Sequence, residues 1–269
     1  MPRIAVRGAG LHYEEHGAGA ETVVFAHGLL WSGRLFDRQV EALAPRYRCV
    51  TFDFRGHGHS EVTADGYDMD SLAADAAGLI EALGCAPCHF VGLSMGGFVG
   101  MRLAIRQPRL LRSLILLETS ADPEPEASRR KYHWMTLAAR WIGLGPLVKP
   151  VMRIIFGRKC LGDPARAALR EQCRRELAGS DRTGIIRAVT GVIDRQGIYE
   201  QLERIATPIL ILVGDQDLAT PPVHSERLHA RIAGSRLRII PGAGHTSTIE
   251  EPAAVNAAIA DFLAGLGRE

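Results

Sequence analysis

Residues 91–97 read Val-Gly-Leu-Ser-Met-Gly-Gly and place Ser94 inside the pattern Gly-x-Ser-x-Gly. The apolar run 88–93 just before the serine is typical of a buried strand, and a mostly apolar helical pattern follows as far as Arg106. A serine on such a sharp turn has a strained backbone that costs roughly 1–3 kcal/mol, and only small flanking residues fit around it. The stretch therefore predicts a nucleophilic serine between a strand and a helix.

Outward from this turn, short apolar runs alternate with helical patterns. Strands are expected at residues 3–7, 11–15, 22–26, 47–52, 88–93, 111–117, 209–213 and 236–240, and helices at 32–43, 70–83, 94–106, 223–232 and 252–263. The first two strands, joined through Gly8 and Gly10, are expected to form a hairpin at one edge. The pattern predicts an α/β fold, with a mostly parallel eight-stranded sheet and helices on both faces.

The alternation stops at Asp122 and resumes at Thr207. Four helical patterns lie between them, at residues 127–142, 147–156, 164–178 and 183–194, and no clear strand. The sequence thus predicts a helical cap, residues 123–206, inserted into a core formed by residues 1–122 and 207–269.

Composition narrows the class of protein. A chain of 269 residues can form one large core, and a net charge of +2 with 23% charged residues does not suggest a nucleic-acid partner. The N-terminus lacks a signal-peptide pattern and no apolar run reaches bilayer length, so we expect a cytoplasmic protein with no membrane partner. The sequence does not distinguish a monomer from a homodimer.

No metal or cofactor is expected. Cys85 and Cys88 have the spacing of redox and zinc sites, but no second pair matches them, and the odd total of five cysteines favours reduced structural thiols. No His-Glu-x-x-His motif occurs, and Gly8-Ala9-Gly10 lacks the third glycine and the helix of a dinucleotide site.

A serine nucleophile needs a base that is oriented by a carboxylate. Asp215 and Asp217 follow the strand predicted at 209–213, and His245 lies in a glycine-rich loop after the last strand. Loops that follow the carboxyl ends of parallel strands converge on one edge of a sheet. We therefore expect Ser94, His245 and one of the two aspartates to meet there.

The Gly-x-Ser-x-Gly turn, the order serine, aspartate, histidine, and the segments His27-Gly28 and 53–60 together resemble the α/β-hydrolase family. The resemblance runs from His27 to the last helix. It implies that Ser94 is the nucleophile, that His245 is the general base and then acid, and that Asp217 orients the imidazole. Asp215 is the rival acid, and Glu118 or Asp122 is a further alternative, because some relatives carry the acid after the preceding strand.

Two backbone N–H groups are expected to stabilise the oxyanion. Met95 offers one at the start of its helix, where the helix dipole also favours negative charge. The resemblance assigns the other to Leu29. His27 and the loop 53–60, which itself contains aspartate, histidine and serine, are interpreted as structural.

Residues 123–197 carry 15 basic and 7 acidic side chains, whereas the remainder carries 17 and 23. The cap arginines either hold an anionic substrate or form solvated helix faces. Trp31 and Phe36 follow the oxyanion loop closely and are expected to touch the ligand. Trp134 and Trp141 are also candidate substrate-binding residues. Like Tyr132, Ile142, Leu144, Ile154 and Phe156, they either line an acyl pocket or pack the cap onto the core.

The resemblance implies a serine hydrolase that cleaves a small-molecule carboxylic ester or lactone through an acyl-enzyme. The run Asp-x-x-Thr-Pro-Pro at 217–222 resembles 3-oxoadipate enol-lactonases, which leaves open an anionic enol-lactone, or a substrate cleaved at a C–C bond. A ligand-binding protein with little turnover is the alternative from another class.

Overall fold

The computed structural model describes residues 2–266 and contains one eight-stranded sheet. The strands are β1 (Arg3–Val6), β2 (Ala9–His16), β3 (Thr22–Ala26), β4 (Arg48–Phe52), β5 (Cys88–Leu93), β6 (Leu111–Leu117), β7 (Ile209–Gly214) and β8 (Arg236–Ile240). Their order is β1-β2-β4-β3-β5-β6-β7-β8, antiparallel at β1–β2 and β2–β4 and parallel elsewhere. The predicted fold class is confirmed. Residues 1 and 267–269 of the predicted core segments lie outside the described residues.

The edge hairpin turns through Arg7 and Gly8, whose φ angles are 48° and 77°. Two consecutive positive φ angles match the right-handed twist of the strands on either side. Gly10, predicted in the connection, already belongs to β2 and lies opposite Ala5.

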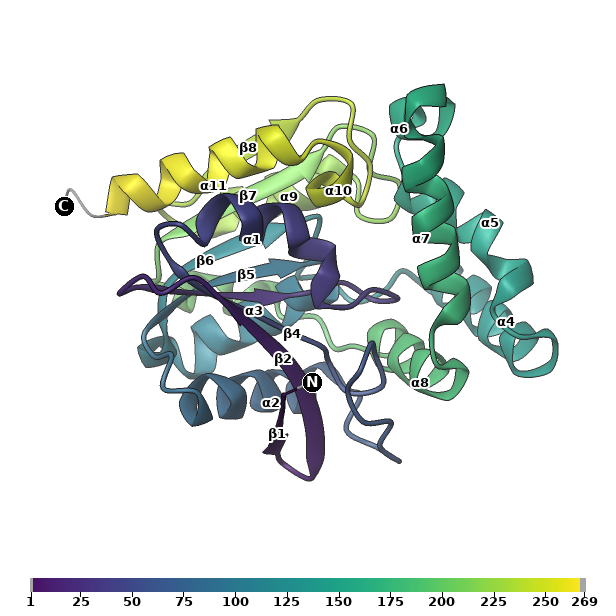
Figure 1. Ribbon diagram of the computed structural model, residues 1–269, viewed down its shortest axis with the longest axis horizontal. Helices are drawn as coiled ribbons and strands as arrows, with labels where there is room; N and C mark the ends of the chain where they lie inside the picture. The colour runs from purple at the N-terminus through teal and green to yellow at the C-terminus, as the bar shows by residue number, and fades with distance from the viewer. Residues whose placement is uncertain (1, 267–269) are drawn as a thin grey trace.

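Helices cover both faces of the sheet (Figure 1). One face carries α1 (Asp37–Leu43) and α11 (Pro252–Leu266), and the other carries α2 (Met69–Ala82), α3 (Met95–Arg106) and α9 (Pro222–Arg231). Side chains alternate along the buried strand β3, so that Val23 and Phe25 join one apolar core while Val24 and Ala26 join the other.

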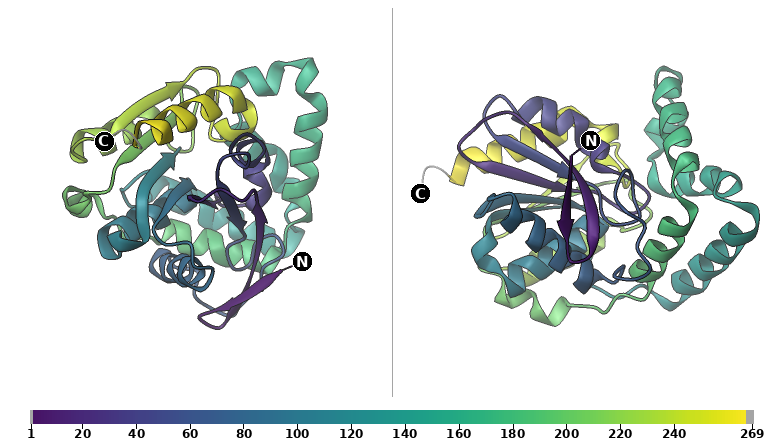
Figure 2. Two further views of the ribbon diagram at one scale, coloured as in Figure 1. Left: turned by 60° about the vertical axis from the view of Figure 1, so that its left-hand side comes forward. Right: turned by 60° about the horizontal axis from the view of Figure 1, so that its bottom comes forward.

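The chain between β6 and β7 is helical. It contains α4 (Glu126–Ile142), α5 (Gly145–Ile155), α6 (Arg158–Gly162), α7 (Ala167–Gly179) and α8 (Arg182–Ile193), which we call the helical layer. Figures 1 and 2 show this layer gathered at one end of the sheet. A short 3-10 helix at Tyr199–Arg204 follows and packs on α3 and α9, so the end of the predicted cap segment lies with the core.

The strand order places a crevice beside β3. In the sheet, β3 lies between β4 and β5. The loop after β3 leads to α1 on one face, and the loop after β5 leads to α3 on the other face, so these two loops diverge and leave the crevice between them. At this point Gly28, just after β3, approaches the end of β5. A Cβ on Gly28 would lie 2.9 Å from Leu93 Cδ2 and 3.6 Å from Ser94 Cβ.

Candidate active site

Ser94 occupies the turn between β5 and α3 with φ 50° and ψ −106°. Its N–H donates to Leu117 O on β6 at 2.8 Å. The two glycines of the motif allow close backbone approach: a Cβ on Gly92 would lie 2.3 Å from Gly96 O, and one on Gly96 would lie 2.0 Å from Ala26 O. Core packing around these glycines therefore holds the serine in its strained conformation.

His245 is oriented by Asp217. Its Nδ1 lies 2.8 Å from Asp217 Oδ2, and the aspartate side chain has no exposed surface. The other carboxylate oxygen accepts from the N–H groups of Ala219 (2.8 Å) and Thr220 (3.0 Å), while Thr220 Oγ1 donates to Oδ2 at 2.8 Å. These donors, together with His245, leave both carboxylate oxygens hydrogen-bonded and fix the side chain in place. This role of Thr220 was not predicted from the sequence. The pattern that could have indicated it is Asp-x-x-Thr, which places the threonine three residues after Asp217.

The three alternative acids lie elsewhere. Asp215 is exposed and accepts from the N–H of Gly242 at 2.7 Å, so it shapes the histidine loop from outside. Asp122 lies near His224 Nδ1 (3.4 Å) and pairs with Arg227 (3.2 Å).

Glu118 is fully buried at the carboxyl end of β6 with φ 42°. Burial, and next the charge of Asp217, raise the pKa of the Glu118 carboxyl well above its usual value. Neither carboxylate oxygen of Glu118 has a hydrogen-bond partner among the described residues, so burial disfavours the charged form of this side chain.

The loop that carries His245 is fastened to the helical layer. The His245 N–H donates to Ile155 O at the end of α5 at 2.8 Å. The buried carboxylate of Glu250 accepts from Gly157 N–H (2.8 Å) and Gly244 N–H (2.9 Å), which joins the two segments. Gly244 is required because a Cβ there would lie 2.4 Å from Gly157 N.

His27 fixes the loop after β3. Its Nε2 accepts from Phe54 N–H at 3.0 Å, so the proton is on Nδ1, which donates to Gly28 O at 2.7 Å. Burial lowers the pKa of His27 to about 4, so the ring is neutral. Because Gly28 O is held on one side of a trans peptide unit, the N–H of Leu29 points to the opposite side.

The N–H of Met95, the first residue of α3, is the second candidate donor. Among residues 2–266 no hydrogen bond occupies the N–H of Leu29 or of Met95. Free backbone donors at a helix start and on the neighbouring loop form a ready site for a negatively charged oxygen.

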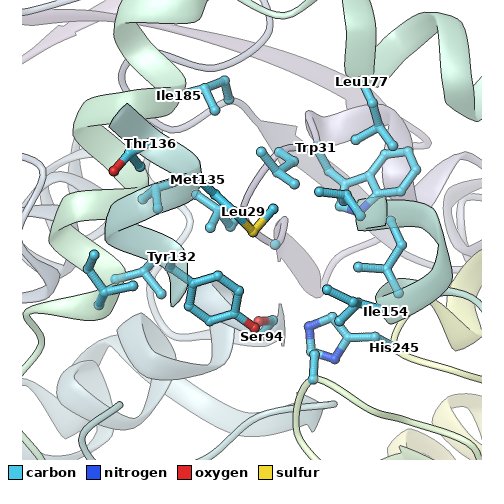
Figure 3. Close-up of a pocket in the computed structure, with 18 of the residues that line it drawn as sticks. Leu29, Trp31, Ser94, Tyr132, Met135, Thr136, Ile154, Leu177, Ile185 and His245 are labelled. Carbon is cyan, nitrogen blue, oxygen red and sulfur yellow. The ribbon is translucent and has the colours of Figure 1, made fainter. Parts of the chain in front are cut away.

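A cavity of about 180 Å³ opens above these groups, between the sheet edge and the helical layer. Gly28, Leu29, Ser94 and His245 line it together, and most of its remaining wall is apolar, with aliphatic side chains contributed by α4, α5 and α8. Figure 3 shows the imidazole ring of His245 turned toward Ser94, with Tyr132 of α4 reaching the same place from the opposite wall. Burial, and next the charge of Glu124, raise the pKa of the Tyr132 hydroxyl, so it remains a protonated donor.

Of the four residues expected to touch the ligand, one lines the cavity. Trp31 does so and is 5% exposed. Phe36 is instead fully buried in the core against Phe25, with ring centroids 5.1 Å apart. Trp134 and Trp141 are 70% and 82% exposed and do not line the cavity, which corrects the sequence-based expectation for these three residues. The sequence identified an apolar helix here but not the face that α4 turns inward.

The cavity wall contains one pair of opposite charges. Arg195 Nη1 lies 2.8 Å from Glu124 Oε2, with side chains 5% and 14% exposed, and the Arg195 guanidinium stacks 4.4 Å from the centroid of the Phe98 ring. Arg195 is the only arginine or lysine among those that line the cavity within the described chain. The other basic residues of the helical layer therefore do not reach it.

Comparison with known proteins identifies the family of the chain. The model of the alpha/beta hydrolase fold family matches residues 21–252, and the chain belongs to that family. This confirms the resemblance found in the sequence.

Three relatives illustrate the range of named activities. The "Putative carbamate hydrolase RutD" of Caulobacter sp. (strain K31) is 30% identical over 95% of this chain and 96% of its own. A thermophilic esterase from Thermogutta terrifontis, solved with malate bound, superposes with a TM-score of 0.92 at 27% identity, covering 99% of both chains. The enol-lactonase from Burkholderia xenovorans LB400 gives 0.90 at 29% identity, covering 98% of this chain and 100% of that one.

Proposed function

We propose that this hydrolase cleaves a neutral, largely apolar carboxylic ester or lactone through an acyl-enzyme on Ser94. The observation that carries the proposal is the juxtaposition in one cavity of the strained Ser94 and of His245, whose Nδ1 is held 2.8 Å from buried Asp217. A strained serine, a base and an orienting carboxylate are the parts that nucleophilic acyl transfer requires.

In this mechanism Ser94 Oγ attacks the carbonyl carbon while His245 Nε2 accepts the serine proton. The negative charge that develops on the carbonyl oxygen is stabilised by the N–H groups of Leu29 and Met95, and Asp217 stabilises the imidazolium. His245 then protonates the departing alcohol oxygen, which leaves the acyl group on Ser94. A water molecule, deprotonated by the same histidine, hydrolyses this ester and frees the serine.

The lining of the cavity favours a neutral acyl group. The charge of Arg195, the one arginine or lysine in the described wall, is already balanced by Glu124 at 2.8 Å, and most of the other lining side chains are apolar. A substrate carboxylate would lose its hydration there without gaining an unpaired cation. For this reason we favour a neutral ester over the dicarboxylate enol-lactone or anionic C–C substrate, although a structural neighbour is named as an enol-lactonase.

We further propose that the helical layer acts as a cap over this cavity, and that the substrate is a small molecule. The hydrogen bond from His245 N–H to Ile155 O supports a cap that is fastened to the catalytic loop.

A fluorophosphonate probe tests the proposal, because it reacts covalently with an activated serine. We expect stoichiometric labelling of the wild type, none of the Ser94→Ala variant, and hydrolysis of p-nitrophenyl esters that exceeds hydrolysis of an enol-lactone dicarboxylate. A protein that binds neutral esters but is never labelled would support a ligand-binding role instead. Preference for the dicarboxylate would overturn the neutral-substrate part of the proposal.

A further inference from the structure

Helix α4 has two opposite faces. Tyr132, Met135, Thr136 and Ala139 line the cavity on its inner side. Arg130, Trp134, Leu137 and Trp141 follow one another at steps of four, three and four residues, so they share the outer side, and we call them the tryptophan stripe.

The tryptophan stripe is exposed. Trp134 is 70% exposed, Leu137 44% and Trp141 82%, and Ile142 at the end of the helix is 58% exposed. Figures 1 and 2 show α4 and α5 on the outer side of the helical layer, away from the sheet. Two exposed tryptophans on one face of a helix are unusual for a surface that meets only water, and such patches mark interaction sites.

The charge around the stripe is mainly positive, because the one acidic residue of α4 and α5 is Glu126, the first residue of α4, which pairs with Arg129 at 3.5 Å. Residues 127–162 contain eight arginines and lysines and no aspartate or glutamate. Two of the eight pair with acidic residues outside this segment: Arg129 with Asp194 and Glu126, and Lys159 with Glu251. The other six, all exposed and without an ion pair inside the described chain, are Arg130, Lys131, Arg140, Lys149, Arg153 and Arg158.

We propose that this face of α4 and α5 binds peripherally to the surface of an anionic lipid membrane. Tryptophan and leucine enter the interface between headgroups and acyl chains, while arginine and lysine remain at the level of the phosphates. None of the described helices has the length and apolarity to cross a bilayer. The proposal departs from the sequence-based expectation of no membrane partner.

A second copy of the chain fits this face less well. In a twofold dimer the same patch lies on both sides of the interface, so Arg130, Lys131 and Arg140 of one subunit would face the same cations of the other. With no acidic side chain in residues 127–162 to offset them, this arrangement is repulsive. An anionic lipid surface, in contrast, complements both the cations and the tryptophans.

Vesicle sedimentation with the full-length protein tests the proposal without any substrate. We expect binding to vesicles of phosphatidylcholine and phosphatidylglycerol, little binding to phosphatidylcholine alone, and release at high salt. Each cation near an anionic surface strengthens binding by roughly fivefold, so Lys149→Glu with Arg153→Glu should weaken it by more than tenfold. The double variant Trp134→Ser, Trp141→Ser should also lose at least tenfold.

Control variants distinguish binding through this face of α4 and α5 from an effect of the overall charge of the protein surface. The double variant Arg3→Glu, Arg204→Glu changes the net charge as much as Lys149→Glu with Arg153→Glu does, but at exposed positions outside the helical layer. Val223→Ser is the control for the tryptophan substitutions, because it removes an exposed apolar side chain from α9. Both controls should bind vesicles as the wild type does. Equal loss in the controls would overturn the assignment to α4 and α5.

Tryptophan emission gives a second readout. The chain has three tryptophans, and Trp31 is buried, so an emission shift to shorter wavelength on adding anionic vesicles would come from the two in the stripe. Lack of vesicle binding, or a dimer that dissociates when Trp134 and Trp141 are replaced, would overturn the membrane proposal. Since binding needs no turnover, the Ser94→Ala variant should bind equally, and failure here leaves the proposed hydrolysis untouched.

Discussion

Replacing Asp217 with asparagine should nearly abolish hydrolysis while the fold survives. Asparagine is isosteric, and its oxygen can still accept from the N–H groups of Ala219 and Thr220. Its amide group, however, donates a hydrogen bond to His245 Nδ1 in place of accepting one. The proton of the neutral imidazole then lies on Nε2, which can no longer accept the proton of Ser94.

The magnitude follows from the geometry. The Asp217 carboxylate lies 2.8 Å from His245 Nδ1, so the two charges in the transition state are centred about 4 Å apart and interact by about 4 kcal/mol at an effective dielectric constant of 20. Loss of this attraction slows the reaction by roughly 10³-fold. With the wrong tautomer added, we expect kcat to fall by about 10³ to 10⁴-fold.

The assay compares Asp217→Asn with Asp215→Asn, using initial rates on a neutral p-nitrophenyl ester and thermal unfolding to check the fold. An asparagine at position 215 can still accept from Gly242 N–H, so kcat should stay within about threefold of the wild type. Full activity in Asp217→Asn would refute the assignment. If that activity disappeared when Glu118→Gln was added, the buried glutamate would be the acid.

Three further predictions address packing, specificity and acid stability. Gly96→Ala places a methyl group 2.0 Å from a backbone oxygen and should unfold the protein or lower its free energy of unfolding by more than about 4 kcal/mol. Gly145→Ala, in open space, should change the free energy of unfolding in urea by less than about 0.5 kcal/mol. Equal stabilities of the two variants would contradict the packing argument. Glu124→Gln leaves Arg195 unbalanced and should raise kcat/KM for an anionic hemiester, relative to a neutral ester, by at least about tenfold; an unchanged ratio would mean that Arg195 does not sense the acyl group. Burial lowers the pKa of His27 to about 4 in the folded protein, compared with about 6.5 in the unfolded chain. The stability that comes from the neutral ring is therefore complete above pH 6.5, and about 3 kcal/mol of it is lost as the pH falls to 4. Urea unfolding should show this decline, and the His27→Gln variant should show a smaller one.

Much of the fold could be predicted because strand and helix periods are local properties of the sequence. All eight strands were expected within one or two residues of their observed bounds. The helix expected at 32–43 divides into a 3-10 helix, Gly33–Phe36, and α1, while the short helices α6 and α10 (Ser247–Glu250) were missed. Segments of four or five residues are too short to reveal a helical period.

The candidate site was also predicted only in part: its catalytic residues were predicted, but most of its cavity wall was not. The positions of Ser94, Asp217 and His245 follow from strand ends, which parallel topology brings to one edge. The cavity wall depends on how α4 rotates about its own axis, and its sequence has apolar residues on both faces. Trp134 and Trp141 are therefore as apolar as Met135 and Ala139 but lie on the other side. Phe36 shows that closeness in sequence to the loop after β3 does not bring a side chain to the cavity.

The most direct test of the account is to trap the acyl-enzyme. After rapid mixing with a neutral p-nitrophenyl ester and acid quench, mass spectrometry of proteolytic peptides should place one acyl group on Ser94 at a stoichiometry near one. A burst of p-nitrophenol of the same size should accompany it, and Ser94→Ala should show neither. Turnover of the ester with an acyl group on another residue, or at an unchanged rate in Ser94→Ala, would contradict the account.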